Sequence, residues 1–500
     1  MRKLHSIMFA GTGSDVGKSV IAAAFCRIFR QDGYHPAPFK AQNMALNSFV
    51  TPDGLEIGRA QVVQAEAAGV APHTDMNPIL LKPQSDHTCQ VVLNGKVEGN
   101  KDAYYYFKKE GRQVYRRAVC DAYDRLSRQY NPIVMEGAGS ISELNLRDTD
   151  LVNMPMAMHA GADVILVADI DRGGVFASVY GSIMLQRPEE RKHIKGILIN
   201  KFRGDIRLFQ SGVKMIEELC HVPVIGVVPY FKDIHIEEED SLQLSSKLHS
   251  AHAEGKVSVA VVLLRHLSNF TDFDALEHDA RIHLFYSNNV KDMAEADIII
   301  VPGTKNTLAD LYELRRNGMA EAIVKAHRNG KTVLGICGGY QILGQEIADP
   351  DHVEGQVDRL PGLALLPVRT VMNGQKTTRQ TSFALSRLQP SALHGYEIHN
   401  GSTFATIDEP VTPLCYKADG STDGCVADAK CMGTYMHGIL DNAEFVDFLL
   451  KPYAQRIAQS QPQESYADFK ERQYNLLADH VRKHVDMKKV YQILTDSSHD

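Results

Sequence analysis

The sequence predicts two α/β units, each built on a doubly wound sheet of parallel strands that alternate with helices. Near-continuous apolar runs of strand length alternate with segments of helical periodicity, which is typical of parallel strands buried on both faces. Two of these runs end in glycine-rich turns that lead into a helical pattern, one near residue 11 and one near residue 337. In such folds, ligands bind at the carboxyl ends of the strands.

Composition limits the function. The chain has 500 residues, 44% of them hydrophobic, which is enough for large cores in two domains. A formal charge of −7 argues against a nucleic-acid-binding protein. The eight cysteines show no CxxC pair or zinc-type spacing, so we expect free thiols in a reducing cytoplasm. No signal-peptide core and no run long enough to span a bilayer is found, so we expect a soluble cytoplasmic protein without a membrane partner.

The first glycine-rich turn has the pattern of a phosphate-binding loop. A strand is predicted at 4–10, the loop at 11–19 and a helix at 20–30. Backbone N–H groups and the helix dipole would hold phosphates, Lys18 would add positive charge, and the hydroxyl of Ser19 would ligate Mg²⁺. The loop residues expected to bind the ATP phosphates are Gly11, Thr12, Asp15, Val16, Gly17, Lys18 and Ser19.

The loop departs from the common pattern in its spacing, because Gly11 precedes Gly17 by six positions rather than five. Position 13 is glycine, whereas partition ATPases of the ParA type have a lysine there. A nucleotide-switch scaffold of that type, carrying an inactive hydrolase domain, is therefore disfavoured.

Polar residues follow several predicted strands of the first unit. Lys40, Glu136, Asp171 and Asn200 end or follow the strands predicted at 38–40, 132–136, 162–167 and 196–200. A further strand is predicted at 223–229, and helices are predicted at 106–129 and 206–220. Since the carboxyl ends of parallel strands share one edge, Glu136 would face the phosphate loop as a second Mg²⁺ ligand. Lys40 and Asn200 are candidate phosphate contacts.

Composition also predicts the domain boundaries. Residues 232–255 are acidic at first and then lack periodicity, which indicates a linker. We therefore expect a nucleotide-binding P-loop domain at 1–231 and a second domain at 256–450. Residues 451–500 have helical spacing and high charge, which predicts a helical extension on the surface.

The second glycine-rich turn predicts a nucleophile. An apolar run ends at Cys337, glycines flank it, and a helical pattern follows, so the thiol would be lifted onto a sharp turn where the helix N-terminus favours the thiolate. A cysteine nucleophile needs a base, and His437 beside Gly438 is the best candidate. Gly338 and Gly303 are candidate N–H donors to an oxyanion.

Longer motifs carry a resemblance. The second unit resembles class I, triad-type glutamine amidotransferases through residues 335–341, and the first resembles dethiobiotin synthetase-like ATPases through its lengthened loop and residues 136–139. The cobyrinate branch of the class I enzymes is matched by residues 301–305, 395–399 and 435–438. Together with the stretches 37–50, 56–61 and 77–83, these motifs make residues 4–450 resemble the cobyric acid synthase family.

The resemblance implies ATP- and glutamine-dependent amidation of the b, d, e and g carboxylates of adenosylcobyrinic acid a,c-diamide, giving adenosylcobyric acid in cobalamin biosynthesis. ATP, with Mg²⁺, would activate each carboxylate, and Cys337 would release ammonia from glutamine through a thioester. The substrates would be small molecules. Lys82, Asp171, Glu397 and His399 are candidates for substrate binding or for orienting the base.

Two questions stay open at this stage. Many class I amidotransferases have Pro-Glu after the histidine, but Gly438 and Ile439 follow His437, so the site is either a Cys-His dyad or uses a carboxylate from elsewhere, such as Glu397. The sister enzyme cobyrinic acid a,c-diamide synthase has the same domains and mechanism but acts on other carboxylates. A plain cysteine hydrolase would leave the ATP half unexplained.

Overall fold

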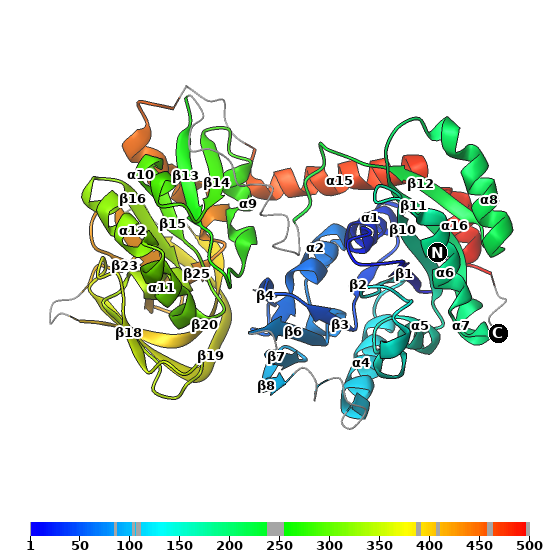
Figure 1. Ribbon diagram of the computed structural model, residues 1–500, viewed down its shortest axis with the longest axis horizontal. Coiled ribbons are helices and arrows are strands. Elements are labelled where there is room, and N and C mark those ends of the chain that lie inside the picture. Colours follow the sequence, from blue (N-terminus) through cyan, green and yellow to red (C-terminus); the bar gives the residue numbers. More distant parts are fainter. Residues whose placement is uncertain are drawn as a thin grey trace. The chain divides into compact units, whose positions relative to one another are not determined.

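The structure, a computed structural model, describes residues 2–84, 88–102, 106, 112–237, 255–386, 392–406, 411–457 and 464–496. The chain divides into two units, drawn in Figure 1: unit 1 comprises Met1–Ala45, Glu56–Glu237 and Ala467–Asp500, and unit 2 comprises Leu46–Leu55 and Glu238–Tyr466. Most of the linker predicted at 232–255 lies outside the described residues. Within the described ranges, no helix combines the length and the apolar character needed to cross a membrane.

Unit 1 is built on a six-stranded sheet in which every pair of neighbouring strands is parallel. In spatial order the strands are β12 (Val224–Pro229), β11 (Ile194–Phe202), β10 (Asp163–Asp169), β1 (Ile7–Gly11), β9 (Ile133–Glu136) and β2 (Ala37–Phe39). Every residue of β1, β9 and β10 is buried, because both faces of the sheet are covered. Each predicted strand is present, with its ends shifted by a few residues.

Helices connect these strands. They are α1 (Lys18–Gln31), α2 (Arg59–Ala68), α4 (Arg112–Ser127), α5 (Met154–Ala160), α6 (Val175–Met184), α7 (Pro188–Arg191) and α8 (Gln210–Cys220). The helix predicted at 106–129 is α4, and residues 107–111 of that prediction lie outside the described residues. A four-stranded sheet in the order β3 (Gln42–Met44), β6 (Ile79–Pro83), β7 (Thr88–Leu93) and β8 (Lys96–Asp102) also belongs to unit 1. The short strand β5 (Glu56–Gly58) precedes α2.

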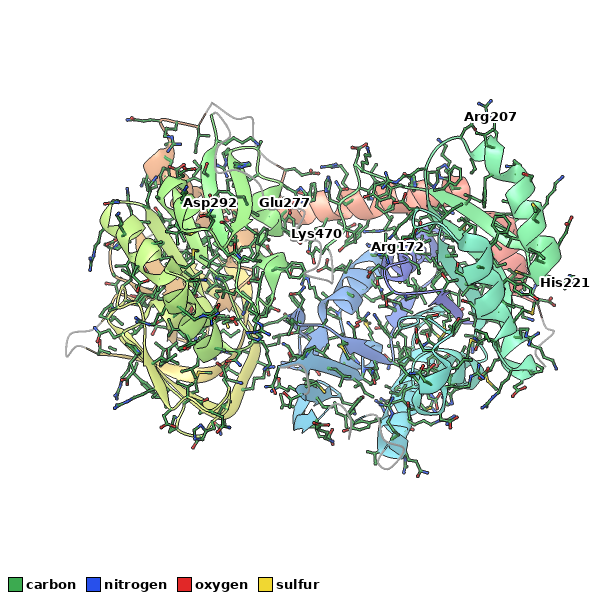
Figure 2. All side chains as sticks on the ribbon, in the orientation of Figure 1. Arg172, Arg207, His221, Glu277, Asp292 and Lys470 are labelled. Atoms are coloured by element: carbon green, nitrogen blue, oxygen red, sulfur yellow. The ribbon has the colours of Figure 1, made fainter. Side chains whose placement is uncertain are left out.

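The C-terminal helices α15 (Tyr466–His484) and α16 (Met487–Ile493) complete the core of unit 1. Apolar residues at helical spacing on α15 are fully buried among those of α1 and β1, and Leu477 and Val481 are examples. At the rim of this contact, Lys470, labelled in Figure 2, donates to both carboxylate oxygens of Glu66 at 3.0 and 2.9 Å. The sequence predicted these helices, but as a surface extension; the structure assigns them to a core.

Unit 2 has a second doubly wound sheet, in the order β14 (Ile282–Ser287), β13 (Val257–Val262), β15 (Ile298–Val301), β16 (Thr332–Ile336), β24 (Cys431–Thr434) and β23 (Cys425–Val426). All pairs are parallel except β23 with β24. Its helices are α9 (Asp274–Glu277), α10 (Val290–Glu295), α11 (Thr307–Arg316), α12 (Met319–Arg328), α13 (Gly338–Leu343) and α14 (Ala443–Leu450).

A second, largely antiparallel sheet in unit 2 was not predicted. Its order is β18 (Arg359–Pro361), β17 (Glu346–Ala348), β19 (Val368–Leu385), β20 (Leu393–Ala405) and β25 (Met436–His437), and β21 (Cys415–Lys417) and β22 (Thr422–Asp423) extend it from β19. The pairing of β20 with β25 places Tyr396 opposite His437. The segment Leu46–Leu55, with strand β4 (Ser48–Val50), also belongs to unit 2.

The packing of α15 gives a prediction for stability. Leu477 is fully buried, whereas the neighbouring Leu476 is 40% exposed. Leu477→Ala should lower the free energy of unfolding of unit 1 by about 2–5 kcal/mol, because it leaves a cavity in a close-packed core. Leu476→Ala should cost less than about 1 kcal/mol. Urea denaturation of the full chain measures both, and equal effects would show that α15 does not complete this core.

Candidate active sites

The turn expected at Cys337 is present and sharp. Cys337 lies between β16 and α13 with φ 53° and ψ −111°, a strained conformation for a residue with a side chain. Glycine is required after it, since a Cβ at Gly339 would lie 1.8 Å from the carbonyl oxygen of Val301. The sulfur Sγ lies 3.7 Å from the carbonyl oxygen of Ile398 on β20. The thiol is therefore held where the two sheets of unit 2 meet.

His437 lies beside this thiol and is paired with a buried acid, Asp272. Its Nδ1 is 2.7 Å from Oδ2 of Asp272, and the backbone N–H of Gly438 donates to Oδ1 at 3.2 Å. Both side chains are buried, with 1% and 4% of their surface exposed. Burial lowers the pKa of His437, but the charge and hydrogen bond of Asp272, followed by the interaction with Cys337, raise it to about 10.

These contacts leave the other imidazole nitrogen for the thiol. Nε2 of His437 is buried and makes no hydrogen bond to an N or O atom in the described part of the chain. The ring stacks on Tyr396 with centroids 5.2 Å apart, which fixes its plane. Gly303 borders the same ring, because a Cβ there would lie 3.5 Å from Cε1 of His437. Cys337, His437 and Asp272 therefore have the arrangement of a catalytic triad.

In unit 1, the phosphate loop and the edge of the sheet meet at Glu136. Ser19 donates through Oγ to Oε1 of Glu136 at 2.8 Å, Lys40 donates to the same oxygen at 2.8 Å, and Gln64 donates to Oε2 at 2.6 Å. Burial raises the pKa of Glu136, but the charge of Lys40 and these hydrogen bonds outweigh burial and hold it below the usual value. The carboxylate therefore stays ionised at neutral pH.

The loop itself is shaped around Lys18 and Gly17. The ammonium of Lys18 donates to the carbonyl oxygens of Gly13 at 2.8 Å and Gly139 at 2.9 Å. Asn200 donates to the carbonyl oxygen of Val16 at 2.8 Å. Gly17 has φ 97°, and a Cβ there would lie 2.2 Å from Nδ2 of Asn200, so only glycine fits.

Family models match both units. Residues 7–244 match the CobQ/CobB/MinD/ParA nucleotide binding domain, and residues 258–445 match the CobB/CobQ-like glutamine amidotransferase domain. The chain is 69% identical over 497 residues to the cobyric acid synthase of Bacteroides fragilis, covering 99% of each chain. It is 65% identical to that of Phocaeicola vulgatus, again over 99% of each chain, and 46% identical to that of Salmonella typhimurium over 98% of each.

The chain belongs to the cobyric acid synthase family. The fold expected from the sequence, a P-loop domain followed by a glutamine amidotransferase domain, is thereby confirmed. The residues that carry the chemistry in this family member are inferred from the geometry described above.

Glu397, one candidate for orienting the base, makes other contacts. It pairs with Arg379 through Oε2 and with Lys417 through Oε1 at 3.1 Å. Burial raises the pKa of Glu397, but Arg379 and Lys417 outweigh burial and lower it. The orienting contact expected of Glu397 is therefore corrected to Asp272. His399 stacks on Tyr435 at 3.7 Å between centroids, and burial lowers the pKa of His399 to about 4.

Sequence reasoning missed Asp272, although a signal was present. Asp272 lies on the short helix η5 (Phe270–Phe273), shortly after β13. The carboxyl end of β13 lies on the same sheet edge as Cys337, since β13, β15 and β16 are neighbouring parallel strands. Glu136 was predicted in unit 1 because polar residues that follow parallel strands gather at the carboxyl edge of the sheet. The same reasoning, applied to unit 2, points to Asp272.

Two other candidates form ion pairs with residues outside the phosphate loop. Lys82 forms a buried ion pair with Glu56 at 2.8 Å. Asp171 pairs with Arg203 at 2.7 Å, whereas Arg172, labelled in Figure 2, reaches Asp15 of the loop at 3.3 Å. Roles of Lys82 and Asp171 in substrate binding stay predictions.

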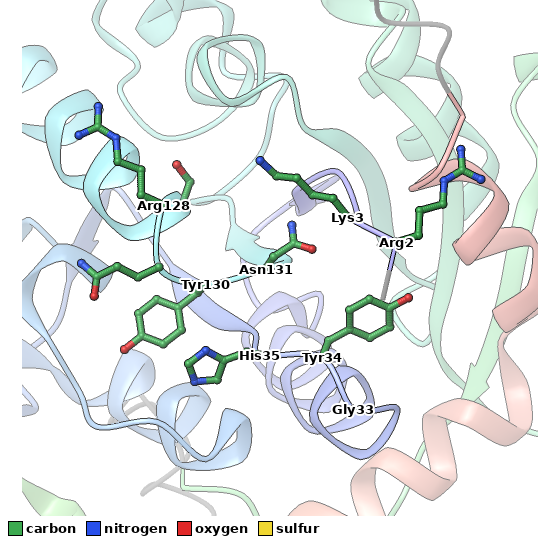
Figure 3. A pocket seen from close by; sticks show the side chains of 10 residues that line it. Arg2, Lys3, Gly33, Tyr34, His35, Arg128, Tyr130 and Asn131 are labelled. Atoms are coloured by element: carbon green, nitrogen blue, oxygen red, sulfur yellow. The ribbon is translucent and has the colours of Figure 1, made fainter.

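Two hollows of unit 1 differ in their relation to the phosphate loop. One, of about 220 Å³, is lined by Ala138–Ile141 and much of residues 146–155, and it includes Gly139, whose carbonyl oxygen accepts from Lys18. The other, of about 370 Å³, is lined by Arg2 and Lys3, by Gly33–His35 and by Ser127–Asn131 (Figure 3). Gly33–His35 precede β2 and Ser127–Asn131 precede β9, so this hollow lies at the amino ends of the strands, opposite the phosphate loop.

The Asp272–His437 pair gives a prediction for pH dependence. Asp272 stabilises protonated His437, so Asp272→Asn should lower the pKa of His437 and shift the alkaline limb of glutamine hydrolysis to lower pH. The value of kcat/KM should also fall by about 10²–10⁴-fold, because the imidazole loses its orienting acceptor. Glutaminase assays between about pH 6 and 10 measure both effects.

Glu397→Gln is the control for this experiment. Since Glu397 does not contact His437, this variant should keep the alkaline limb in place. A shift in Glu397→Gln and none in Asp272→Asn would return the orienting role to Glu397.

Proposed function

We propose that this protein amidates the b, d, e and g carboxylates of adenosylcobyrinic acid a,c-diamide, using ATP and ammonia released from glutamine. The single observation that carries the proposal is the presence, in one chain, of an ionised Glu136 beside a phosphate loop and of a Cys337–His437–Asp272 triad. Relatives named cobyric acid synthase match this chain over nearly their whole length.

The triad supplies the ammonia. Cys337 attacks the side-chain amide carbon of glutamine, and the imidazolium of His437 donates a proton to the departing ammonia. Asp272 holds the imidazole in the required orientation, and the backbone N–H groups of Gly303 and Gly338 stabilise the oxyanion. Water then attacks the thioester, which frees glutamate and returns the thiol.

The phosphate site activates the acceptor carboxylate, because a free carboxylate is a poor electrophile. A carboxylate oxygen of the substrate attacks the γ-phosphorus of ATP, ADP leaves, and ammonia then displaces phosphate from the acyl phosphate. Lys18 and Lys40 offset the charge that develops on the transferred group. Gly11–Gly17 and Asn200 shape the loop that holds the other phosphates.

The residues of this site fit Mg²⁺. The hydroxyl of Ser19 and Oε1 of Glu136 lie 2.8 Å apart, and both are hard oxygen donors. Mg²⁺ commonly takes only one or two protein ligands and fills its other positions with phosphate oxygens and water. Bound there, it would neutralise charge on the β- and γ-phosphates.

The hollow of about 220 Å³ beside Gly139 is the proposed entrance for the acceptor carboxylate. Gly139, which lines this hollow, accepts a hydrogen bond from Lys18 through its carbonyl oxygen. A carboxylate side chain of the substrate placed in the hollow therefore approaches the phosphate loop. The size of the hollow suits one carboxylate arm of a corrinoid. We also propose that unit 1 acts as the synthetase and unit 2 as the glutaminase, in place of the predicted bounds 1–231 and 256–450. The protein works in the cytoplasm, where its eight free thiols stay reduced.

Separate loss of the two activities tests this division of labour. Cys337→Ala should abolish amidation with glutamine, by at least about 10³-fold, and spare amidation with added ammonium salt. Lys18→Ala should reduce amidation with glutamine and amidation with ammonium salt alike, because Lys18 serves the activation of the carboxylate by ATP and not the release of ammonia. Cys120→Ala is the control, since Cys120 is a partly exposed thiol on α4. A folded Cys337→Ala variant without ammonia-dependent activity would overturn the proposal.

The number of amidations separates this activity from that of the sister enzyme, cobyrinic acid a,c-diamide synthase. Mass spectrometry of the corrinoid after incubation of adenosylcobyrinic acid a,c-diamide with ATP, Mg²⁺ and glutamine should show four successive replacements of OH by NH₂. The same enzyme given cobyrinic acid itself should not produce the a,c-diamide efficiently. The reverse pattern would assign the chain to the sister activity.

A further inference from the structure

A segment from the first part of the chain lies in unit 2, next to the triad. Leu46–Leu55, here called the arm, is flanked in sequence by residues of unit 1 but clusters with unit 2. It contacts β19 as well as supports of the triad. These supports are the short helix η5, which carries Asp272, and Tyr396, the ring stacked on His437.

Two reciprocal hydrogen bonds join the arm to η5. The backbone N–H of Phe270 donates to Oδ1 of Asn47 at 3.2 Å, and the backbone N–H of Ser48 donates to Oδ1 of Asn269 at 3.0 Å. All four residues are buried, with 1–5% of their surface exposed. Loss of either hydrogen bond is costly in this buried environment, because it leaves a buried N–H without an acceptor.

Asn269 also sets the start of η5. It has φ 53°, a left-handed conformation that asparagine tolerates better than most residues, and its carbonyl oxygen accepts from the N–H of Asp272 at 3.0 Å. A shift in the backbone of Asn269 therefore displaces Asp272, which lies in the same helical turn. Asp272 in turn holds both Nδ1 of His437 and the N–H of Gly438.

The arm reaches the base from its other side through Tyr396. The hydroxyl of Tyr396 donates to the carbonyl oxygen of Ser48 at 3.4 Å, and Phe49 packs on the same ring with centroids 4.6 Å apart. Val50 is fully buried against Tyr396 and Ile398, and the carbonyl oxygen of Ile398 faces Sγ of Cys337. One short segment thus packs against the supports of the acid, the base and the nucleophile.

We infer that Asn47 and Asn269 are positioning residues of the glutaminase site, and that the arm holds Asp272 and Tyr396 in the geometry that His437 requires. This inference rests on the proposed glutamine hydrolysis at Cys337. Asn47 and Asn269 act through Asp272 and touch no reacting atom. They should therefore affect turnover more than the binding of glutamine.

The test compares Asn47→Ala and Asn269→Gly in the full chain. Glycine keeps the left-handed backbone at 269 and removes only the acceptor for Ser48. Each variant should lower kcat for glutamine hydrolysis by about tenfold or more, with KM within about twofold, since small misplacements of catalytic groups are costly. The loss of kcat in the double variant should be much smaller than the product of the two single losses, because both hydrogen bonds hold the same element, η5.

The pH profile provides a readout that simple destabilisation would not move. The ionisable groups that face His437 are Asp272, Cys337, His399 and the stacked Tyr396. If the arm holds Asp272 in place, both variants should shift the alkaline limb of glutaminase activity to lower pH, in the direction of Asp272→Asn. Asn269→Asp, which keeps the acceptor oxygen and tolerates the left-handed backbone, should recover most of the lost kcat.

Thr378→Val is the matched control. Thr378 donates to the carbonyl oxygen of Gly54 at 2.8 Å, so this variant also removes a hydrogen bond to the arm, but away from η5. It should stay within about twofold of the wild-type kcat. Amidation with ammonium salt should be unchanged in every variant, which shows that the phosphate site is intact.

The outcomes separate this inference from the proposed function. Wild-type protein that does not hydrolyse glutamine would overturn the proposed function. Wild-type protein that hydrolyses glutamine, together with Asn47→Ala and Asn269→Gly variants of unchanged kcat and alkaline limb, would overturn the positioning role alone. A kcat that falls equally in Thr378→Val would also overturn it, because the effect would then belong to the arm's stability.

Discussion

The buried contact between Asp272 and His437 is the interaction on which the architecture of unit 2 depends. The two residues lie on different elements, η5 and β25, and their side chains meet at 2.7 Å out of contact with solvent. An ion pair in such a place is stable only if its geometry is good and its other polar atoms have partners. The backbone N–H of Gly438 donates to the other carboxylate oxygen of Asp272, and the thiol of Cys337 lies beside the second imidazole nitrogen of His437.

The glycines around the triad follow from this contact. β25 reaches the site by pairing with β20, and a Cβ at Gly395 on β20 would lie 2.7 Å from the carbonyl oxygen of His437. Gly339 keeps the helix after Cys337 against β15 in the same way. Close approach of three backbones thus brings thiol, imidazole and carboxylate together. In unit 1, Glu136 has a similar place: it is a buried carboxylate at the edge of a sheet, held by side chains from α1 and α2 and by Lys40, which follows β2.

The sequence predicted what depends on local pattern. Apolar runs predicted the parallel strands, and the glycine turns predicted the phosphate loop and the position of Cys337, because both signals lie within a few consecutive residues. Asp272 was not predicted because its partner His437 lies 165 positions away in sequence, and the signal for it, its place shortly after β13, does not by itself single out one carboxylate. Glu397 was named as one possible orienting carboxylate, but Arg379 and Lys417 pair with its oxygens. The antiparallel sheet was missed because β19, its longest strand, is largely half-exposed and lacks a continuous apolar run.

The segments of the two units interleave along the chain. The chain passes between the units at residues 45/46, 55/56, 237/238 and 466/467, so no single cut separates them. A cut in the region 232–255 would remove Leu477 and Val481 from the core of unit 1, and it would remove Val50 from its place against Tyr396 in unit 2. In sequence, the arm lies between Lys40 and Gln64, which both donate to Glu136. The residues that support the triad are thus continuous in sequence with those that support the phosphate site, and neither unit retains its full set of supporting contacts without the other part of the chain.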